Sequence, residues 1–586
     1  MADVRTYDLV IVGGGTAGCI LAAKISEKGV NPETGQRLKI AMVEAGAYLR
    51  GAPKPGYGIP LRRQVFTNMP RDIKFGSHFV TAQGRGRGVG GSSLIFGSGA
   101  WFPFDEDYDE WQEETGTDWS KENMKSAVEE ARHVFNVEFP PEQTLSNRRA
   151  SELFKRAAES MGYEVRPGHS RAVKNCIFCG HCAERQICKY DSKATTLITH
   201  APIAERNGVD IIPNARAQKI IIERSGGKAV ARGVIIRKLD LPDEVYPGDD
   251  FVDWNQAKEI TILAKKVIVS CGDLETPPLL FASGYGSKED CGRGLIVENP
   301  NVGRNVDGHY GEGGQIGVIG LFSERVGGMD GGWGVDPLLH FQTRIGEDRI
   351  VLLNGYAAPP FYSFWNGFPE RLALSPFAPP YGQAFSDVIR LTPAFGWEHK
   401  EYMRQICNPW ATPSAASLKA RDPLFHVARL AVDMKLPRAA PRGRIDRYSR
   451  VQIFGEEVIK HSKETGKQER IYHEIHPEVY KKFAAGQELA KTVLQKMGAK
   501  KIIAEPIIPS GGLTFKWLVG GCRAGADPKN SVINSHFESH DVEGLFIVDA
   551  GSIPRSPTLG LFLTVGIVSI FASDRIIARH FTKKTR

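Results

Sequence analysis

The chain has 586 residues and a mass of 64.5 kDa, which is more than one ordinary hydrophobic core accommodates, so at least two domains are expected. Hydrophobic residues make up 41% and charged residues 24%, a composition that excludes an intrinsically disordered chain. The net charge of +8 comes from 75 basic and 67 acidic residues spread along the sequence, so nucleic acid is not an expected partner.

The first residues show no positively charged segment followed by an apolar stretch and a cleavage site. No secretory signal is therefore predicted, and a cytoplasmic location is expected. The longest apolar stretch, residues 559–572, is shorter than a bilayer requires and contains Thr564, Gly566 and Ser569. It is predicted to be a buried helix, so we expect no membrane span.

The chain begins with a short apolar run at residues 7–12, then glycines, a helical pattern at 17–28 and a second apolar run at 38–43. This order predicts a strand–helix–strand unit. Residues 311–448 are rich in Gly, Pro and aromatic residues, which is typical of a sheet-based substrate domain with loops over a pocket. The other predicted elements are helices at 119–137, 151–161 and 471–497, a helix end and a strand within 201–223, and strands at 230–238, 259–269 and 545–548.

The turn between the first strand and the first helix carries a G-x-G-x-x-G motif. Its glycines allow a tight turn, close approach of a pyrophosphate and close helix–strand packing, and the helix N-terminus supplies amide donors. An acidic residue after the second strand is placed to bind ribose hydroxyls and disfavours a 2′-phosphate. Together they predict a dinucleotide site. Its predicted contacts are Gly13, Gly15, Thr16, Ala17, Gly18 and Glu44.

Four further segments resemble the glucose–methanol–choline (GMC) oxidoreductase family, which is built around FAD. They are the Gly-Ser loop at 88–93, the strand and turn at 267–277, the V-G-R-N segment at 302–305 with His309, and the late strand at 544–554. They follow the family's order, and the resemblance spans residues 5–575.

The resemblance implies a Rossmann-type FAD-binding domain assembled from discontinuous segments, plus an α+β substrate domain with a mainly antiparallel sheet. The FAD-binding segments are expected at 1–110, 201–310 and 510–586, a helical and Cys-rich insertion at 111–200, and the substrate domain at 311–509. Beyond the first motif, the resemblance places these residues against FAD: Gly88, Gly91, Ser92, Ser93, Asp549, Ala550, Leu561 and Thr564.

Four cysteines within thirteen residues have the spacing C-x2-C-x2-C-x5-C: Cys176, Cys179, Cys182 and Cys188. The spacing is similar to an iron–sulfur motif with a longer final gap and predicts a 4Fe–4S or 3Fe–4S cluster. Structural zinc, disulfides and unliganded thiols are the alternatives.

The cysteine insertion resembles a branch of the family that contains sugar dehydrogenase large subunits and long-chain alcohol oxidases. In the former a cluster relays electrons away from FAD. This resemblance implies a protein electron partner, such as a cytochrome, a ferredoxin or a small subunit. It also gives the alternative location, the periplasm, reached by co-export with a signal-bearing partner.

The chain departs from the family where its alcohol-oxidising members carry a pair of proton-accepting residues. Trp517 occupies the His position and Gly560 the second His or Asn position, and neither accepts a proton. Lys516 flanks this site and can bind a carboxylate or an enolate. Trp517 offers a flat apolar wall, which favours an aromatic or apolar substrate over a free sugar. Candidates for a replacement base are His340, His399, His426 and Tyr310.

Three functions follow from these features. The first is an FAD-dependent dehydrogenase that oxidises a CH–OH group of a small organic substrate, with an iron–sulfur cluster relaying electrons to a protein or quinone. The second uses the same cofactors to reduce or desaturate a C–C bond, which the missing proton acceptors favour. The third is a catalytically silent flavoprotein subunit. We predict the first and keep the other two as alternatives.

Overall fold

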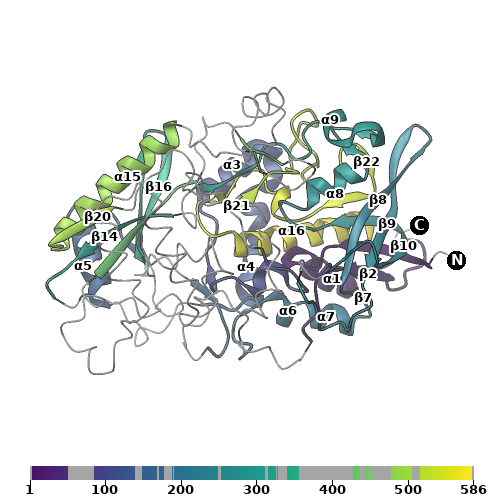
Figure 1. Cartoon of the computed structure of the whole chain (residues 1–586), viewed down its shortest axis with the longest axis horizontal. Coiled ribbons are helices and arrows are strands. Elements are labelled where there is room, and N and C mark those ends of the chain that lie inside the picture. The colour runs from purple at the N-terminus through teal and green to yellow at the C-terminus, as the bar shows by residue number, and fades with distance from the viewer. Residues whose placement is uncertain are drawn as a thin grey trace.

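The computed structural model describes residues 3–50, 85–138, 148–167, 170–176, 188, 190–248, 252–310, 315–324, 326, 339–355, 427–435, 442–445, 447, 451–452, 477–504 and 515–583. Within these residues the chain forms two main sheet-based units, each with its own hydrophobic core. In Figure 1 the first unit lies on the right, together with both chain ends, and the second unit lies on the left.

The first unit is an eight-stranded sheet with a parallel centre and an antiparallel side. The parallel strands lie in the spatial order β23, β10, β1, β2, β7, and β9 pairs with β10 in the antiparallel direction. The strands are β1 (Asp3–Val12), β2 (Ile40–Val43), β7 (Asp210–Ile212), β8 (Ala215–Ser225), β9 (Lys228–Lys238), β10 (Lys258–Val269), β22 (Val542–Glu543) and β23 (Leu545–Ile547).

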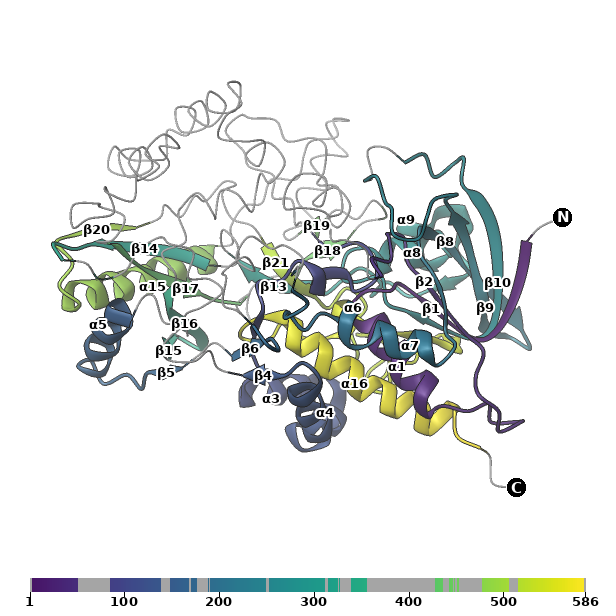
Figure 2. The ribbon, with the colours of Figure 1, turned by 90° about the horizontal axis from the view of Figure 1, so that it is seen from below.

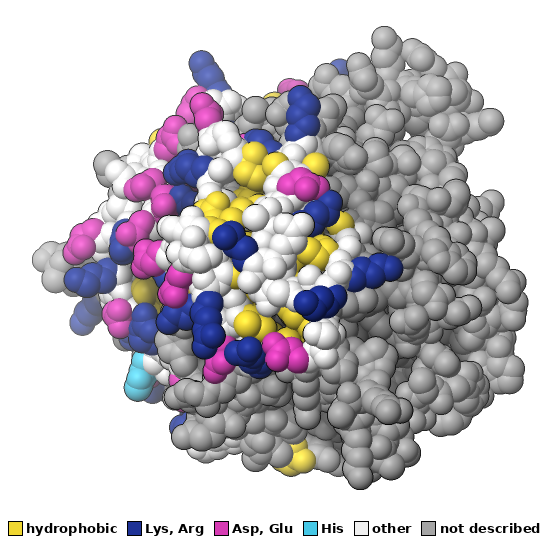
Figure 3. Space-filling view, turned by 90° about the vertical axis from the view of Figure 1, so that its left-hand side faces the viewer, with side chains coloured by type: hydrophobic (Ala, Val, Ile, Leu, Met, Phe, Trp, Pro, Cys, Tyr) yellow, Lys and Arg dark blue, Asp and Glu magenta, His cyan; other side chains and the backbone are white. Residues whose placement is uncertain are grey.

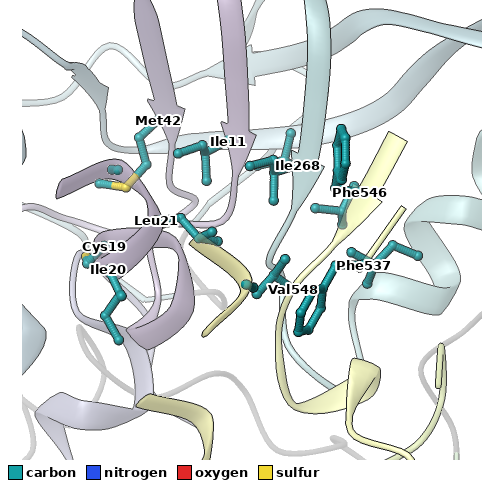
Figure 4. Packing of buried hydrophobic residues seen from close by; sticks show 14 of the residues in the cluster. Ile11, Cys19, Ile20, Leu21, Met42, Ile268, Phe537, Phe546 and Val548 are labelled. Carbon is teal, nitrogen blue, oxygen red and sulfur yellow. The ribbon is translucent and has the colours of Figure 1, made fainter. Parts of the chain in front are cut away.

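Two helices that are far apart in sequence cover one face of this sheet. They are α1 (Thr16–Lys28) and α16 (Leu561–His580), which run side by side in Figure 2. Figure 4 shows apolar side chains of the strands, among them Ile11, Met42 and Ile268, beside Leu21 of α1. The apolar strands therefore match a sheet that is covered on its faces, as parallel sheets usually are.

Within the described ranges, α16 is the one helix long and apolar enough to cross a bilayer by length and composition. However, 72% of its most apolar window is buried inside the protein. An ion pair also joins α16 to α1, since Asp574 of α16 pairs with the buried Lys24 of α1, which pairs with Glu130 as well. These features are typical of a core helix, as the sequence predicts.

The parallel strands end level with one another, which fixes the position of the site. Val12 is paired with Val43 on one side and with Val269 on the other, and Val269 is paired with Ile547. The chain segments that follow these residues therefore meet at a single edge of the sheet. In open parallel sheets, the carboxyl edge is where ligands bind.

The second unit is an antiparallel sheet in the order β20-β14-β17-β16-β15-β5, as the resemblance implies. Helices α15 (Pro477–Lys496) and α5 (Arg148–Glu159) pack against it. Its strands are β5 (Arg166–Pro167), β14 (Gln315–Leu321), β15 (Leu339–Ile345), β16 (Asp348–Gly355), β17 (Val427–Asp433) and β20 (Lys501–Ala504). Residues 148–167, predicted to belong to the insertion, thus belong to this unit by packing.

The outer face of the second unit is an ordinary solvated surface. Figure 3 shows basic and acidic side chains mixed across it, with small apolar groups between them. The remaining elements lie at the junction or around the first unit. They are α3 (Asp105–Thr115), α4 (Lys121–Val134), α6 (Thr196–Thr199), α7 (Ala201–Arg206), α8 (Thr276–Ala282), α9 (Lys288–Cys291), β3 (Gly99–Ala100), β4 (Val137–Glu138), β6 (Ser170–Ala172), β11 (Tyr285–Gly286), β12 (Val297–Glu298), β13 (Asp307–Tyr310), β18 (Arg444–Ile445), β19 (Val451–Gln452) and β21 (Phe515–Val519).

Candidate functional site

The first glycine turn is shaped so that two of its three glycines admit no side chain. A Cβ atom on Gly13 would lie 2.3 Å from the carbonyl oxygen of Ser270, and Gly13 also has a φ of +105°. A Cβ atom on Gly18 would lie 1.8 Å from the carbonyl oxygen of Gly13. In contrast, a Cβ atom on Gly15 would meet nothing closer than 4.0 Å. Gly15 therefore leaves room beside the N-terminus of α1, where a pyrophosphate is expected.

The carboxylate of Glu44 joins three backbone segments at this edge. Its Oε2 accepts a hydrogen bond from the Gly14 amide (2.9 Å), and its Oε1 accepts from the amides of Gly46 (2.8 Å) and Gly88 (3.0 Å). The side chain is buried, with 8% exposure. Glu44 thus ties the first glycine turn to the second glycine loop, and its carboxylate retains lone pairs for ribose hydroxyls.

The second glycine loop, residues 86–93, lies directly against the first turn. The Gly90 amide donates to the carbonyl of Gly14 (2.8 Å), and a Cβ atom on Gly91 would come within 2.7 Å of the Gly15 Cα. Ser93 is buried and donates to the Gly90 carbonyl (2.6 Å), whereas Ser92 is exposed. The loop therefore presents Ser92 outward and uses Ser93 to hold its own shape.

Asp549 closes the same edge from the C-terminal part of the chain. Its Oδ2 accepts from the Gly272 amide (2.9 Å) and the Thr276 hydroxyl (2.6 Å), and its Oδ1 accepts from the Gly551 amide (2.8 Å). Burial raises the pKa of this carboxyl to about 6. Next to it, Ala550 begins a buried turn of 3-10 helix that ends at Ser552. The late strand thus delivers an acidic group to the edge.

Leu561 and Thr564 lie in the first turn of α16. The Thr564 side chain is fully buried, and its hydroxyl oxygen has no hydrogen-bond partner in the described part of the protein. A buried hydroxyl without a partner is uncommon and indicates a place where a bound group supplies one. Together with the open space at Gly15 and the carboxylate of Glu44, this feature fits an elongated dinucleotide such as FAD.

Replacement of Glu44 by glutamine is predicted to lower the free energy of unfolding by about 2 kcal/mol, because an amide group cannot accept from all three backbone amides. Chemical denaturation of the purified protein measures this change. Glu223→Gln is the matched control, since the Glu223 carboxylate is largely exposed and pairs only at 3.4 Å with Arg232. Equal stability of the two variants would contradict the predicted role of Glu44.

Trp517, at the family's His position, lies on β21 with a φ of +56°, which is an outlier for a bulky side chain. Its indole ring meets the imidazole of His309 edge-on, with ring centroids 4.9 Å apart. The backbone of Lys516 pairs with that of His309, but the Lys516 side chain is outside the described part of the structure. The structure therefore places a strained aromatic residue, not a proton acceptor, at this position.

His309 is fully buried and held on both sides. Its Nε2–H donates to the carbonyl of Pro557 (2.7 Å), and its Nδ1 lies 2.7 Å from an oxygen of Asp433. Because a carbonyl only accepts, Nε2 carries the proton of the bond to Pro557. His309 therefore fixes the segment that leads to Gly560 and is not free to act on a substrate.

Gly560, the second position, lies against an aromatic cluster. It has a φ of +35°, and a Cβ atom there would come within 2.5 Å of Trp101 Cδ1. His340 of β15 packs edge-on against Trp101, with ring centroids 5.6 Å apart, and lies 6.1 Å from the ring of Phe104. Gly560, which replaces the family's second proton acceptor, and His340, one of the four proposed replacement bases, thus both lie against Trp101.

The side chains of the other three candidates are outside the described part of the structure. His399 and His426 are outside the described residues, and for Tyr310 the structure describes the backbone of β13 but not the side chain.

Sequence reasoning missed an ion-pair network that contacts the segment 555–558. In this network Asp107 accepts hydrogen bonds from the amide and hydroxyl of Thr558 and contacts Lys435 at 3.3 Å. No local pattern marks it, because Asp107 and Thr558 are separated by 451 residues.

The cysteine motif is described only in part. Cys176 and Cys188 are partly exposed, and Cys179 and Cys182 are outside the described residues. Within the part of the chain that the structure covers, no group of three or more His, Cys, Asp or Glu side chains is arranged to hold a metal ion.

Two family models for GMC oxidoreductases match the chain, one at residues 7–311 and one at residues 444–568. The chain therefore belongs to the GMC oxidoreductase family. This result confirms the predicted family, the fold class and the enzyme class, an FAD-dependent oxidoreductase.

Among curated proteins, the chain is similar to pyranose dehydrogenase 3 of Leucoagaricus meleagris, with 23% identity over 341 residues that cover 51% of this chain and 50% of that protein. It is 20% identical over 595 residues to a long-chain-alcohol oxidase of Arabidopsis thaliana, covering 97% of this chain and 67% of that protein. A glucose dehydrogenase (FAD, quinone) of Drosophila pseudoobscura pseudoobscura is 25% identical over 329 residues, covering 52% and 48%. The chain thus spans about half the length of the pyranose and glucose dehydrogenases.

Solved structures share the fold. The chain aligns with pyridoxine 4-oxidase from Mesorbium loti with a TM-score of 0.60 and 17% identity, covering 98% of this chain and 99% of that chain. A fungal aryl-alcohol oxidase aligns with a TM-score of 0.57 and 16% identity, covering the same shares. These likenesses show that the whole chain follows one fold, and they say nothing about the substrate.

Proposed function

We propose that the protein is an FAD-dependent dehydrogenase that oxidises a CH–OH group of a small organic substrate with an apolar or aromatic body. The observation that carries this proposal is the state of His340, which is buried at 3% exposure and whose ring nitrogens make no hydrogen bond of ordinary geometry in the described structure, although the backbone of Arg166 lies close to the ring. Buried polar groups are nearly always satisfied, so a group left open among the described residues marks a place where a bound molecule can supply the partner.

His340 is in the protonation state that can accept a proton. Burial lowers its pKa to about 4, so the imidazole is neutral at pH 7 and offers one N–H donor and one nitrogen lone pair. Its surroundings include the aromatic rings of Trp101 and Phe104, and the positive charge of Arg166 also lowers its pKa. Trp101 also contacts Gly560, where the family has a proton-accepting side chain. We infer that His340 takes over this role from a neighbouring strand.

In this mechanism bound FAD supplies the hydride acceptor, through contacts with the carboxyl edge of the sheet. The substrate hydroxyl donates its proton to the unprotonated nitrogen of His340 while the C–H bond breaks and the C=O bond forms. Trp517 and Trp101 bind the apolar body of the substrate and exclude water. His309, paired with Asp433, holds the segment 557–560 in place through the carbonyl of Pro557. Gly560 has no side chain and so leaves room for the substrate.

The relatives support the reaction class through their names, since pyranose dehydrogenase and long-chain-alcohol oxidase both denote enzymes acting on hydroxyl-bearing compounds. The apolar character of the site favours an alcohol over a free sugar. The proposal is therefore an alcohol with an aromatic or long-chain apolar body.

We also propose that the cysteine motif holds an iron–sulfur cluster and that electrons leave through it to a protein partner. The support is the spacing of the four cysteines, of which Cys176 and Cys188 are described and partly exposed. We expect iron and acid-labile sulfide in protein purified without oxygen, and loss of both in a Cys182→Ser variant. Zinc in place of iron would overturn the relay.

The alternative function is reduction or desaturation of a C–C bond by the same cofactors, favoured by Trp517 and Gly560 at the family's two proton-accepting positions. One experiment separates the two. Flavin absorbance is recorded without oxygen while long-chain, aromatic and sugar alcohols are added in turn. Bleaching by an aromatic or long-chain alcohol supports the proposal. Best turnover with a sugar, or no bleaching but re-oxidation of reduced protein by unsaturated compounds, contradicts it.

A further inference from the structure

A cavity formed by the segments around residues 304, 443 and 523 is lined by arginines. It has a volume of about 450 Å³, and its wall includes Arg304, Arg442, Arg444 and Arg523, with Glu114 as the one carboxylate in the lining. This volume is within the range of small-molecule sites, roughly 300–1,000 Å³. Four guanidinium groups around one concavity are uncommon, because like charges repel one another.

The walls of the cavity come from separate parts of the chain that the backbone joins firmly. The Gly303 amide donates to the Gly521 carbonyl (2.7 Å), and Val306 and Gly443 exchange two backbone hydrogen bonds (2.8 and 2.9 Å). Arg442 also donates to the carbonyl of Pro554 (3.2 Å). The arginines are therefore presented by a rigid frame, which limits the entropy lost when a ligand binds.

Three of the four arginines are already partly neutralised. Arg442 and Arg523 share the two oxygens of Glu114, at 3.0 and 2.8 Å, and Arg444 pairs with Asp290 at 3.0 Å. The side chains of these three arginines are only 11–20% exposed.

The side chain of Arg304 has no hydrogen bond or ion pair within the described residues. The cavity thus holds at least one uncompensated positive charge among arginines withdrawn from bulk water.

The charges around Arg523 point the same way. Burial lowers the pKa of its guanidinium, as do the neighbouring Arg442 and Arg555, and Glu114 offsets this effect only in part. An added anion would relieve the repulsion. A phosphate monoester has two charges and three oxygens, so it can accept paired hydrogen bonds from two guanidinium groups at once, whereas a carboxylate has one charge and two oxygens.

We propose that this cavity binds the phosphate group of a phosphorylated small molecule, with Arg304 as its main contact and Arg444 and Arg523 beside it. The cavity is larger than a phosphate group, so the ligand carries an organic body. The proposal does not depend on the oxidation chemistry, because none of the residues that line the cavity has a role in it.

The test is a binding titration of the full-length protein by calorimetry with inorganic phosphate, glycerol 3-phosphate, succinate and glycerol. We expect glycerol 3-phosphate to bind more tightly than phosphate, and both to bind more tightly than succinate or glycerol. In Arg304→Gln the affinity for glycerol 3-phosphate should fall at least about tenfold, since a charge-assisted contact is lost.

Arg232→Gln, on the exposed surface of β9, is the matched control and should bind as the unmodified protein does. Arg304→Gln should keep the same denaturation midpoint, because its side chain has no partner in the described structure to lose. The proposal is overturned if phosphates do not bind, if succinate binds equally well, or if Arg304→Gln binds like the control.

Discussion

Replacement of His340 by glutamine should lower kcat for the alcohol substrate by about 10²- to 10⁴-fold, the usual contribution of a general base. Glutamine keeps the size and polarity of the side chain but does not take a proton from a hydroxyl group at neutral pH. KM should change much less, because the aromatic walls that bind the substrate remain. Steady-state kinetics with the best alcohol measures both constants.

The pH profile distinguishes a base from a residue that only shapes the pocket. The pKa of His340 is about 4 in the folded protein, so the base form is present above that pH and lost below it. The kcat/KM of the unmodified enzyme should therefore decline toward pH 4, and this decline should vanish in His340→Gln. His133→Gln, at an exposed site on α4, is the control. If His340→Gln retains kcat and the acid limb, His340 is not the base, even if the protein proves to be an alcohol dehydrogenase.

The same lowered pKa has a consequence for stability. An unfolded His has a pKa of 6.5, so between pH 6.5 and 4 the unfolded chain binds a proton at His340 that the folded protein does not. Stability from this residue is complete above pH 6.5 and is lost as the pH falls. On going from pH 7 to pH 5, the unmodified protein should lose about 2 kcal/mol more than His340→Gln. Chemical denaturation at the two pH values gives this difference, and the similarly buried His200 cancels because both proteins contain it.

The parts of the site that the sequence predicts are those encoded within a short stretch. The glycine turn and Glu44 follow directly from the order strand, glycines, helix, strand, and the structure brings Glu44 to the amides of that turn. The late acidic strand is also recognisable, since Asp549 follows an apolar run. These local patterns fix the edge of the sheet because the parallel strands end level with one another.

The parts that sequence reasoning could not supply depend on contacts between distant residues. His309 and Asp433 are 124 residues apart, and nothing in either local sequence marks them as partners. His340 could be named only as one of several candidates, because its position follows from the packing of β15 against Trp101 and Phe104, which are distant in sequence. The positive φ of Trp517 is equally hidden, since a bulky residue rarely adopts that conformation. The positions of the residues proposed to contact the substrate are therefore decided by long-range packing and not by local sequence pattern.

Substitutions at Gly18 and at Gly15 of the first glycine motif should have different effects, the first on folding and the second on cofactor binding. Gly18→Ala should lower the free energy of unfolding by about 3 kcal/mol or more and give little soluble protein, because the new Cβ atom would lie 1.8 Å from the Gly13 carbonyl oxygen. That oxygen has little freedom to move, since the Gly13 amide donates to Val43 (2.8 Å) and Gly13 lies against Ser270. Soluble yield and chemical denaturation measure this effect.

Gly15→Ala is the matched variant, with the opposite expectation. Its Cβ atom meets nothing closer than 4.0 Å and its φ of −71° suits alanine, so the fold should be kept. Flavin content after purification should nevertheless fall, and the affinity for added FAD should weaken at least about tenfold, because the methyl group occupies the space through which a pyrophosphate approaches the helix N-terminus. Full flavin content in Gly15→Ala would mean that the cofactor does not cross this turn. A stable, flavin-loaded Gly18→Ala would mean that the turn is looser than its contacts indicate.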